Sequence, residues 1–366
     1  MTTIRELTNY LESLAPLNYQ ESYDNAGLIV GAPQMGITNV LVSLDTTEAV
    51  VEEAIAKNCN LIVAHHPIVF KGIKKLNGKN YVERAIIKAI KNDVAIYAIH
   101  TNMDNVADGM NFMIAEKLGL KDVKILAPQK NTLSKLVSFV PVADTQRVLD
   151  ALYAVGVGQI GNYDHCSFRV AGTGTFRPND AAKPVIGRAN QDETVAEDRL
   201  EVVFPTYLES VVLRALRAAH PYEEVAYYVS EVANQNQEVG AGAIGTFSEP
   251  LSTNDFLQFL KQTFQLKVIK HTPIVKDKIQ KIAVCGGAGS FLLNHALAAQ
   301  ADVFITADYK YHEFFDADGQ IMICDIGHYE SEVCMKEGLQ RYLSKKFSSF
   351  AAISSETVTN PVQYFV

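Results

Sequence analysis

The stretch that decides the fold is residues 321–332, which read IMICDIGHYESE. Its apolar start predicts a short buried strand, and Gly327 predicts a turn into a helix that runs to about Leu343. On that helix His328 and Glu332 lie four residues apart, so their side chains share one face. The same face continues with apolar residues, namely Met335, Leu339 and Leu343. We therefore expect the two metal-binding side chains to point into a site inside the protein.

Other apolar runs end in residues of the same type, which gives weight to a spacing that can also arise by coincidence. The run LIVAHHP predicts a strand that ends in adjacent histidines, His65 and His66. The run VAIYAIHTNMDN predicts another strand that ends at His100, with Asp104 four residues later. The alternatives are a buried histidine pair satisfied by hydrogen bonds, an Asp104 that caps the next helix, and a His100 that only supports a ligand.

These strand ends together predict a dinuclear divalent-metal centre. Functional groups in open α/β sheets gather beyond the carboxyl ends of parallel strands. Several imidazoles and two carboxylates are enough for a pair of ions when one carboxylate bridges them. Imidazole and carboxylate ligands without thiolates suit zinc, and also iron, manganese or nickel. We expect two divalent ions per chain, with zinc as the first choice.

Composition and charge are typical of a globular enzyme. Of 366 residues, 48% are hydrophobic and 20% are charged, and the formal net charge is −8. This acidic balance argues against general binding to nucleic acids or membrane surfaces. No apolar run reaches the roughly 18 residues of a membrane span, and no secretory signal is visible at the start. The five unclustered cysteines are typical of a reducing compartment, so we expect a cytoplasmic protein.

The N-terminal third alternates between strand and helix patterns. Thr3 and Glu6 predict a capping box for the first helix, and the βαβαβα order that follows predicts a mostly parallel sheet with helices on its faces. Asp45 ends one strand, either as a support for a metal ligand or as a helix cap. Lys71 and Lys74 belong to a lysine run that predicts either a solvated loop or a binding site for an anionic substrate.

The order of elements divides the chain into three segments. Residues 1–128 and 238–366 form two halves of an α/β core, and residues 129–237 carry a βαββαβ pattern of ferredoxin type. The glycines of residues 286–290 predict either a phosphate-binding turn or close packing of a strand against a helix. His312 either faces the same cavity or lies on the surface. The predicted fold class is α/β, with mostly parallel sheets in a two-part metal-binding core and a ferredoxin-like insert.

Several motifs stand out when the chain is taken as a whole. They are YDNAGL from residue 23, AHHP from residue 64, FKG from residue 70, HTNMD from residue 100 and GHYESE from residue 327. In combination they resemble the motifs of the NGG-interacting-factor-like dinuclear-metal proteins, whose bacterial members are called GTP cyclohydrolase 1 type 2 homologues. The middle segment, with HPYEE from residue 220, resembles the PII- and CutA-like insert of the longer family members.

The resemblance implies a two-metal site that His100 lines and whose ligands are His65, His66, Asp104, His328 and Glu332. It also implies a homo-hexameric ring with the sites facing a central cavity. Because one carboxylate can span two ions, we assign the bridge to Glu332, and we expect His100 to act as a general acid/base or an orienting group.

The function that we expect is a metal-dependent hydrolase acting on a nucleotide-like small molecule, such as the purine ring of GTP. Lys71 and Lys74 would bind the anionic part of that substrate. The alternative is a non-catalytic metal-binding or regulatory protein whose insert senses a small molecule or a partner.

Overall fold

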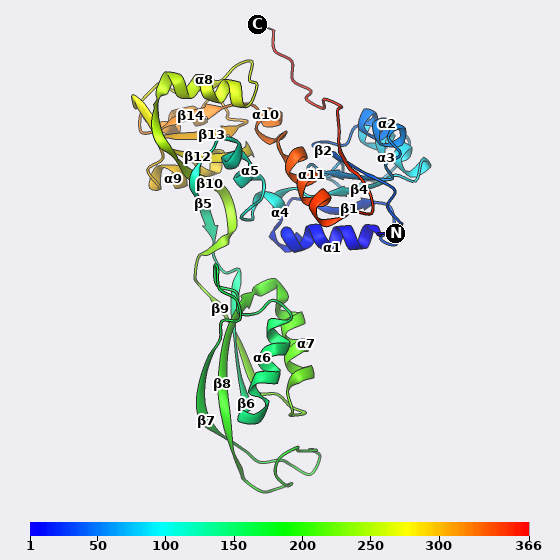
Figure 1. Cartoon of the computed structure of the whole chain (residues 1–366), viewed down its shortest axis with the longest axis vertical. Helices are drawn as coiled ribbons and strands as arrows, with labels where there is room; N and C mark the ends of the chain where they lie inside the picture. The colour runs from blue at the N-terminus through cyan, green and yellow to red at the C-terminus, as the bar shows by residue number, and fades with distance from the viewer. Residues whose placement is uncertain (366) are drawn as a thin grey trace. The chain divides into compact units, whose positions relative to one another are not determined.

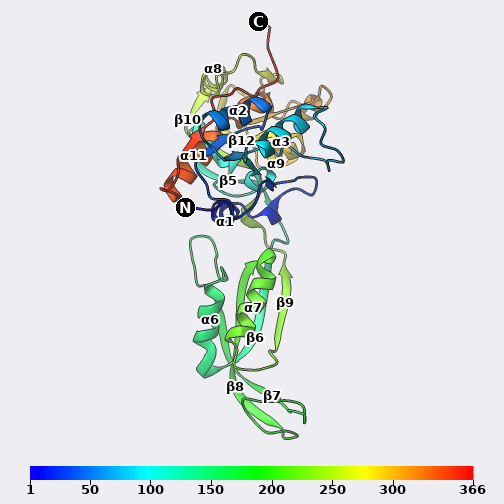
Figure 2. The same cartoon turned by 90° about the vertical axis from the view of Figure 1, so that its right-hand side faces the viewer.

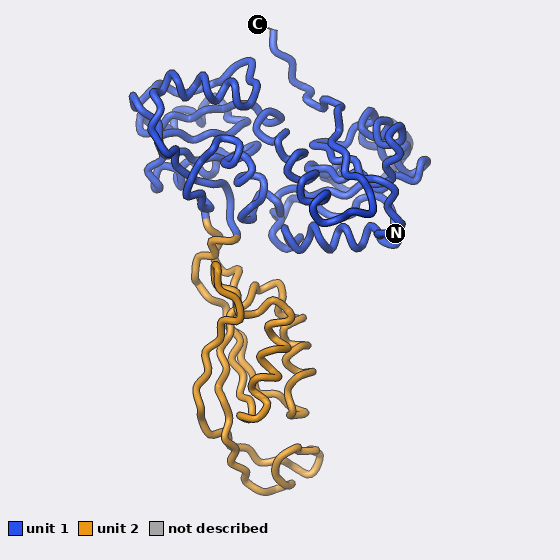
Figure 3. Tube along the Cα trace, in the orientation of Figure 1, with its two compact units in different colours: residues 1–127, 239–366 blue, residues 128–238 orange. Residues whose placement is uncertain are grey.

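The computed structural model describes residues 1–365, and within them the chain divides into two compact units. Unit 1 consists of residues 1–127 and 239–366, and unit 2 of residues 128–238 (Figure 3). Each unit has a hydrophobic core made from its own residues. Across residues 1–365, no helix combines the length and the apolar character that crossing a bilayer requires.

The first sheet of unit 1 is mostly parallel, as the sequence predicts (Figure 1). In spatial order its strands are β1 (Gly27–Val30), β4 (Ala95–Ala98), β3 (Leu61–Ala64), β2 (Val40–Ser43) and β15 (Ala352–Ser354). β4, β3, β2 and β15 pair in parallel, whereas β1 is antiparallel to β4. The sequence pattern does not predict β15, which brings the C-terminal part of the chain back beside β2.

Helices cover both faces of this sheet, because its strands are apolar on both sides. On one face lie α1 (Ile4–Leu14) and α11 (Met335–Lys346), and on the other α2 (Glu48–Ala56) and α3 (Tyr81–Lys91). Val42 packs with the first pair of helices and its neighbour Leu41 with the second, as the two-residue period of a strand requires. The predicted capping box at the start of α1 is confirmed: Thr3 and Glu6 each accept the other's backbone N–H.

The second sheet of unit 1 is mixed. In spatial order its strands are β11 (Lys270–His271), β14 (Met322–Asp325), β13 (Val303–Ala307), β12 (Lys278–Ala288), β10 (Asn236–Ser252) and β5 (Lys121–Gln129). β12, β13 and β14 are parallel, whereas β10 and β11 run antiparallel to their neighbours. The parallel arrangement that we expect is therefore found in the middle of this sheet, with antiparallel strands on either side.

The two sheets of unit 1 share one hydrophobic core. Side chains of both sheets pack in it together with helices α1, α11, α5 (Met110–Lys117) and α8 (Thr253–Thr263). A smaller core on the opposite face of the second sheet contains α9 (Leu293–Ala298). The shared core fixes the strand ends of one sheet relative to those of the other.

The helix predicted after Gly327 is divided in the structure. α10 (His328–Glu332) ends after little more than one turn, and α11 begins at Met335. The Ser331 hydroxyl donates to the carbonyl oxygen of His328 at 2.8 Å, and such a side-chain bond to the backbone competes with the helical ladder. Gly327 makes the turn into α10, as predicted, with a φ of +92° that other residues rarely adopt.

Unit 2 is an antiparallel sheet with helices packed on one face (Figure 1 and Figure 2). Its elements in chain order are β6 (Leu133–Pro141), α6 (Thr145–Tyr153), β7 (Phe168–Phe176), β8 (Glu193–Pro205), α7 (Glu209–Ala219) and β9 (Tyr227–Val232). The spatial order β7-β8-β6-β9 with antiparallel pairing is the arrangement of a ferredoxin-like unit. Leu133 of β6 lies opposite Val232 of β9, so the unit begins and ends at nearly the same place.

One carboxylate fixes the chain that follows β15 to helix α2. Glu53 accepts hydrogen bonds from the Ser355 hydroxyl at 2.6 Å, the Glu356 N–H at 2.8 Å and the Thr357 hydroxyl at 2.6 Å, and it pairs with Lys57 at 2.8 Å. Burial alone would raise the pKa of Glu53, but these bonds outweigh it and lower the pKa to about 2. The ionised form of Glu53 therefore stabilises the folded C-terminal segment.

We expect unit 1 to fold without unit 2. Replacing residues 129–237 with a short Gly/Ser linker should leave a soluble protein, because neighbouring strands begin and end the insert and the core of unit 1 contains none of its residues. Circular dichroism during heating and light scattering test this expectation. Aggregation, or loss of a cooperative unfolding transition, would show that the insert is needed for the fold.

Glu53→Gln should destabilise the protein most above about pH 5. The folded-state pKa of about 2 lies below the ordinary value of 4.5, so the stabilisation is present above that value and is lost as the pH falls from 4.5 toward 2. The difference in unfolding free energy between wild type and variant, measured by urea denaturation, should shrink over that range. Glu249→Gln, at an exposed position, is the control. A difference that does not change with pH would contradict this role.

Candidate metal centre

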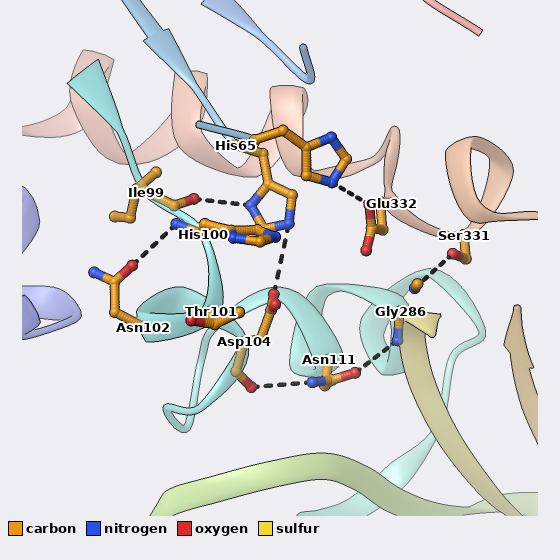
Figure 4. A network of polar contacts seen from close by, with 12 residues as sticks. His65, Ile99, His100, Thr101, Asn102, Asp104, Asn111, Gly286, Ser331 and Glu332 are labelled. Atoms are coloured by element: carbon orange, nitrogen blue, oxygen red, sulfur yellow. Dashed lines mark hydrogen bonds and ion pairs between the residues drawn. The ribbon is translucent and has the colours of Figure 1, made fainter. Parts of the chain in front are cut away.

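Side chains that could bind a metal meet at one place, and they follow strands of both sheets of unit 1 (Figure 4). They are His65 and His66 after β3, His100 after β4, Asp104 at the end of α4 (Thr101–Asp104), and His328 and Glu332 on α10. Each follows the carboxyl end of a parallel strand, which is where the sequence reasoning expects such groups. The fold brings them together although 262 residues separate His66 from His328.

Glu332 and two histidines form the first group of ligand atoms. Glu332 Oε2 lies 3.0 Å from Nε2 of His66 and 3.0 Å from Nε2 of His328. These two nitrogens lie 3.4 Å from each other. His328 and Glu332 share one face of α10, as their spacing predicts. Atoms of the types that bind divalent metals therefore converge within the reach of one ion.

The second group lies beside the first and shares His66 with it. It contains the ligand nitrogens of His65, His66 and His100, which all lie within 4.8 Å of one another. Nε2 of His65, a fully buried residue, lies 3.6 Å from Oδ1 of Asp104. Asp104 does not cap the following helix, because Gly109 precedes the first residue of α5. The side chain of Asp104 is therefore available to the site.

Each of these imidazoles is fixed in orientation by a hydrogen bond at its Nδ1. The acceptors are the Ile99 carbonyl for His65 at 2.8 Å, Asp45 for His66 at 2.8 Å, Asp24 for His100 at 2.8 Å and Asp308 for His328 at 2.7 Å. A carbonyl oxygen can only accept, so Nδ1 of His65 carries a proton and Nε2 of the neutral ring keeps a lone pair. Histidines that bind metals are commonly oriented in this way.

Buried polar atoms without hydrogen-bond partners lie at the centre of the site. Residues 1–365 contain six buried side-chain atoms of this kind, and three of them are His65 Nε2, Asp104 Oδ1 and Glu332 Oε2. Glu332 Oε2 is close to two imidazole nitrogens but makes no well-aligned hydrogen bond with either. Each such atom costs roughly 1–3 kcal/mol. A divalent cation held among them would remove these costs, so the residues fit a metal.

Burial and mutual contact separate the pKa values of these groups. Burial lowers the pKa of His65 to about 3, so its ring is neutral near pH 7. Burial also disfavours the charged forms of His66 and His328, but the neighbouring carboxylates outweigh it and raise the pKa of His66 to about 10 and that of His328 to about 9. At Glu332 burial would raise the pKa, but the two histidines hold it below its ordinary value. At Asp104 burial prevails and raises the pKa.

The sequence reasoning does not give a role to Asp24. Its carboxylate accepts hydrogen bonds from Nδ1 of His100, from the Thr101 N–H at 3.0 Å and from the Thr101 hydroxyl. Burial acts against ionisation of Asp24, but these bonds prevail and lower its pKa to about 2. The position of Asp24 inside the YDNAGL motif was the sequence feature that could have identified it. Asp308, the support of His328, was visible only as a polar residue at a strand end.

Asn111 was also not identified from the sequence, although it connects two parts of the site (Figure 4). Its side-chain amide donates to the carbonyl oxygen of Asp104 and accepts from the N–H of Gly286, both at 3.0 Å. Asn111 is 2% exposed on a helix whose other buried residues are apolar. A polar residue at a core position of a predicted helix was the signal that could have identified it.

The glycines at the end of β12 allow α10 to approach closely. A Cβ at Gly287 would lie 2.4 Å from Oε1 of Glu332, and the φ of Gly287 is +61°. The N–H of Gly287 donates to the Ser331 hydroxyl at 3.0 Å, and the N–H of Gly286 is already donated to a side chain. The structure therefore favours close packing over a phosphate-binding turn at this position.

Of the remaining residues that the sequence suggested for the site, one reaches it and the others do not. Asp45 supports His66, a candidate metal ligand, and the cap of α2 is Thr47 instead. Lys71 and Lys74 are exposed, and neither lines the cavity in front of the ligand atoms. His312 is also exposed and does not line that cavity. The structure thus brings Asp45 to the site and leaves the two lysines and His312 outside it.

A cavity of about 1280 Å³ lies in front of the ligand atoms. Residues from both sheets of unit 1 line it, together with part of the C-terminal segment. In that segment the Thr359 hydroxyl donates to Asp45, and the Asn360 amide donates to Glu330 at 3.0 Å. The segment that Glu53 anchors therefore continues into one wall of the cavity.

Comparisons with known proteins agree with this architecture. The model of the Duf34/NIF3 (NGG1p interacting factor 3) family matches residues 2–361. The GTP cyclohydrolase 1 type 2 homolog of Bacillus subtilis is 38% identical over 367 aligned positions, which cover 98% of either chain. The homolog of the same name from Halalkalibacterium halodurans is 37% identical over 359 positions, with 96% of either chain covered.

Solved structures give the same result. A Bacillus cereus protein related to NIF3 superposes with a TM-score of 0.87 at 37% identity, and the match covers 100% of this chain and 99% of the other. A Staphylococcus aureus protein superposes with a TM-score of 0.80 at 30% identity, with the same coverage. The likeness extends over both units of the chain.

Purified protein should contain close to two divalent ions per chain, and Glu332→Ala should lose at least one of them, because its oxygen lies between two imidazole nitrogens. Plasma spectrometry of protein purified without added chelator measures this. The protein in which a linker replaces residues 129–237 should keep both ions, since every candidate ligand lies outside the insert. His271→Ala, outside the ligand groups, is the control. Two ions in Glu332→Ala would exclude a bridging role.

Proposed function

The chain belongs to the Duf34/NIF3 (NGG1p interacting factor 3) family, and on this basis we propose that it is a metal-dependent hydrolase with a dinuclear divalent-metal centre. The observation that carries the proposal is the set of buried, unpartnered ligand atoms on His65, Asp104 and Glu332. Relatives that match nearly the whole chain are named GTP cyclohydrolase 1 type 2 homologs, which supports a nucleotide-like substrate.

We assign one ion beside each group of ligand atoms, with His66 serving the ion of the first group and His100 not acting as a ligand. His65 and Asp104 would hold one ion, and His66 and His328 the other. Glu332 would bridge them, because its Oε2 lies beside Nε2 of both His66 and His328 and its carboxylate has a second oxygen to offer. Zinc is the first choice for these nitrogen and oxygen ligands, with iron, manganese and nickel as alternatives. Bound divalent ions would supply Lewis acidity and a lowered pKa for water.

His100 is our candidate for the general acid/base. Its Nδ1 is bonded to Asp24, and its ring centroid lies 5.2 Å from that of His65 and 5.3 Å from that of His66. The low pKa of Asp24 keeps its carboxylate ionised near pH 7, where it accepts the hydrogen bond from Nδ1 of His100 and leaves Nε2 free. Nε2 of His100 can therefore give or take a proton beside a substrate bound in the cavity.

His100→Gln should lower kcat by roughly 10²- to 10⁴-fold, the usual contribution of a general acid/base. Its metal content should stay at the wild-type value, because the assignment gives His100 no ion to hold. Steady-state kinetics and plasma spectrometry on the same preparation measure the two quantities, and His271→Ala is again the control. If His100→Gln lost an ion, His100 would be a ligand and another group would have to transfer the proton.

Lys71→Ala should leave the KM of any substrate unchanged within about twofold. The sequence suggests that Lys71 and Lys74 bind an anionic part of the substrate, but both lysines are exposed and do not line the cavity. Ground-state binding by a lysine would appear as a raised KM at constant kcat. Steady-state kinetics of Lys71→Ala and of the double variant with Lys74→Ala therefore decide whether the lysine run is more than a solvated loop.

The second candidate function is a non-catalytic metal-binding or regulatory role, with unit 2 as the sensor of a small molecule or partner. The separate core and ferredoxin-like arrangement of unit 2 favour this alternative. Metal-replete, full-length protein should be tested for turnover of a panel of nucleosides and nucleotides. Turnover of any of them supports the hydrolase. Lack of turnover with all of them, together with binding of one to unit 2, supports the regulatory role.

The proposed assembly is a homo-hexameric ring, and the proposed location is the cytoplasm. The family resemblance supports the ring, and the five cysteines, all within the described residues and all free, support a reducing compartment. Light scattering of the full-length protein tests the assembly, and a monomer at micromolar concentration would contradict it.

A further inference from the structure

The C-terminal segment after β15 runs along the cavity from the first sheet to the second. Beside the first sheet, Thr357 donates its N–H at 3.1 Å and its hydroxyl at 2.6 Å to Glu53 of α2. At the far end, Nζ of Lys267, just before β11 of the second sheet, lies 5.9 Å from the centroid of the Tyr364 ring. We call residues 355–364 the C-terminal strap. Between its two anchors the strap lines the cavity with Thr359, Asn360, Pro361 and Val362.

One residue of the strap reaches the support of a candidate metal ligand. The Thr359 hydroxyl donates a hydrogen bond to Oδ2 of Asp45, and Oδ1 of the same carboxylate is bonded to Nδ1 of His66 at 2.8 Å. Because the two bonds use different oxygens, Thr359 and His66 hold the carboxylate of Asp45 from both sides. A carboxylate that orients a metal-binding histidine affects how tightly the histidine binds the metal. Thr359 therefore acts on His66 through Asp45.

The next residue of the strap contacts α10, the helix that carries the other candidate ligands. The side-chain amide of Asn360 donates to Oε1 of Glu330 at 3.0 Å, and Glu330 lies between His328 and Glu332 on that helix. The side-chain oxygen of Asn360 accepts the N–H of Val362 at 3.0 Å, so the amide is held at both ends. A helix as short as α10 has few hydrogen bonds of its own to hold it in place. The contact with Asn360 therefore helps to fix its position.

These contacts connect the strap to both histidines of one proposed ion. Nε2 of His66 lies 3.4 Å from Nε2 of His328, and the two residues follow strands of different sheets. A tetrahedral zinc ion takes nitrogen ligands roughly 3.3 Å apart, as metal–nitrogen bonds of about 2.0–2.1 Å require. The observed spacing therefore already suits an ion, and a small shift of α10 away from the first sheet would spoil it.

We propose that the C-terminal strap is a clamp for the metal centre, in which Thr359 and Asn360 hold His66 and α10 at the spacing that one ion needs. The inference rests on the proposed metal centre and adds two positioning residues to it. Neither residue belongs to the groups of ligand atoms, so they act through Asp45 and Glu330. Because coupling between binding events is reciprocal, a strap that tightens metal binding is itself held more firmly when the metal is bound.

Point variants of the full-length, zinc-loaded protein test the clamp by titration with a chromogenic chelator. Thr359→Val removes the hydroxyl at nearly constant side-chain size, whereas Thr359→Ser keeps the hydroxyl. We expect Thr359→Val to weaken the affinity for one of the two ions by roughly tenfold, the lower end of the range for groups that orient ligating histidines. Thr359→Ser should bind zinc as the wild type does. Val358→Ala, in the same segment at a position 73% exposed, is the matched control and should also retain wild-type affinity.

Hydrogen exchange measured by mass spectrometry tests the reciprocal effect. Zinc should slow amide exchange in residues 356–362 of the wild type relative to metal-free protein, because the clamped strap opens less often. Asn360→Ala should speed exchange in α10 even in metal-free protein, because its contact with Glu330 is lost. Peptides from β7 of unit 2 serve as the internal reference and should not respond to zinc.

Failure of the clamp and failure of the metal centre give different results. The clamp is overturned if Thr359→Val keeps both ions with wild-type affinity, if Thr359→Ser loses as much affinity as Thr359→Val, or if zinc leaves exchange in residues 356–362 unchanged. Each of these results leaves the metal centre standing. Wild-type protein that binds no zinc would instead contradict the metal centre and the clamp together.

Discussion

A carboxylate removed from water stays ionised only if positive charge lies beside it, and Glu332 imposes this condition on the core of unit 1. Glu332 is 3% exposed, and its Oε2 lies 3.0 Å from the imidazoles of His66 and His328. Either those imidazoles carry protons or a cation takes the protons' place. Metal binding at this site should therefore release protons, as it does wherever metals compete with protons for imidazole nitrogens.

The rest of unit 1 serves to hold these groups in register. The candidate ligands follow β3 and β4 of one sheet and β14 of the other, so their convergence depends on the core that both sheets share. Each imidazole is oriented through Nδ1 by an acceptor that the fold holds in place, and Gly287 gives Glu332 room to approach β12. Ligand positions set by strands and packed helices are more precise than positions on loops.

The sequence could predict the parts of this site that depend on local pattern. Apolar runs that end in His65, His66 and His100 identify strand ends, and the spacing of His328 and Glu332 identifies a helix face. Among the supporting residues, the strand-end position of Asp45 suggested its role, whereas the others could not be predicted in this way. Asp24 meets His100 across 76 positions of the sequence, and such a contact leaves no periodic signal in a single chain.

Two features of the fold, β15 and the break between α10 and α11, could not be predicted from local sequence patterns for the same reason. β15 is too short to show a clear strand pattern in the sequence. It forms because the C-terminal segment packs beside β2. Just before the break between α10 and α11, the Ser331 hydroxyl turns back to the carbonyl oxygen of His328. Helical periodicity continues across that break, so the sequence predicts one helix where the structure has two.

The acidity of the cavity favours the retention of divalent ions. Seven carboxylates line it, and they raise the local concentration of cations. Several of them are also engaged within the protein: Asp45 and Asp308 accept hydrogen bonds from His66 and His328, and Asp325 is paired with Lys270. The groups that attract cations therefore include the groups that orient the imidazoles, so the charge of the cavity and the geometry of the candidate ligands depend on the same side chains.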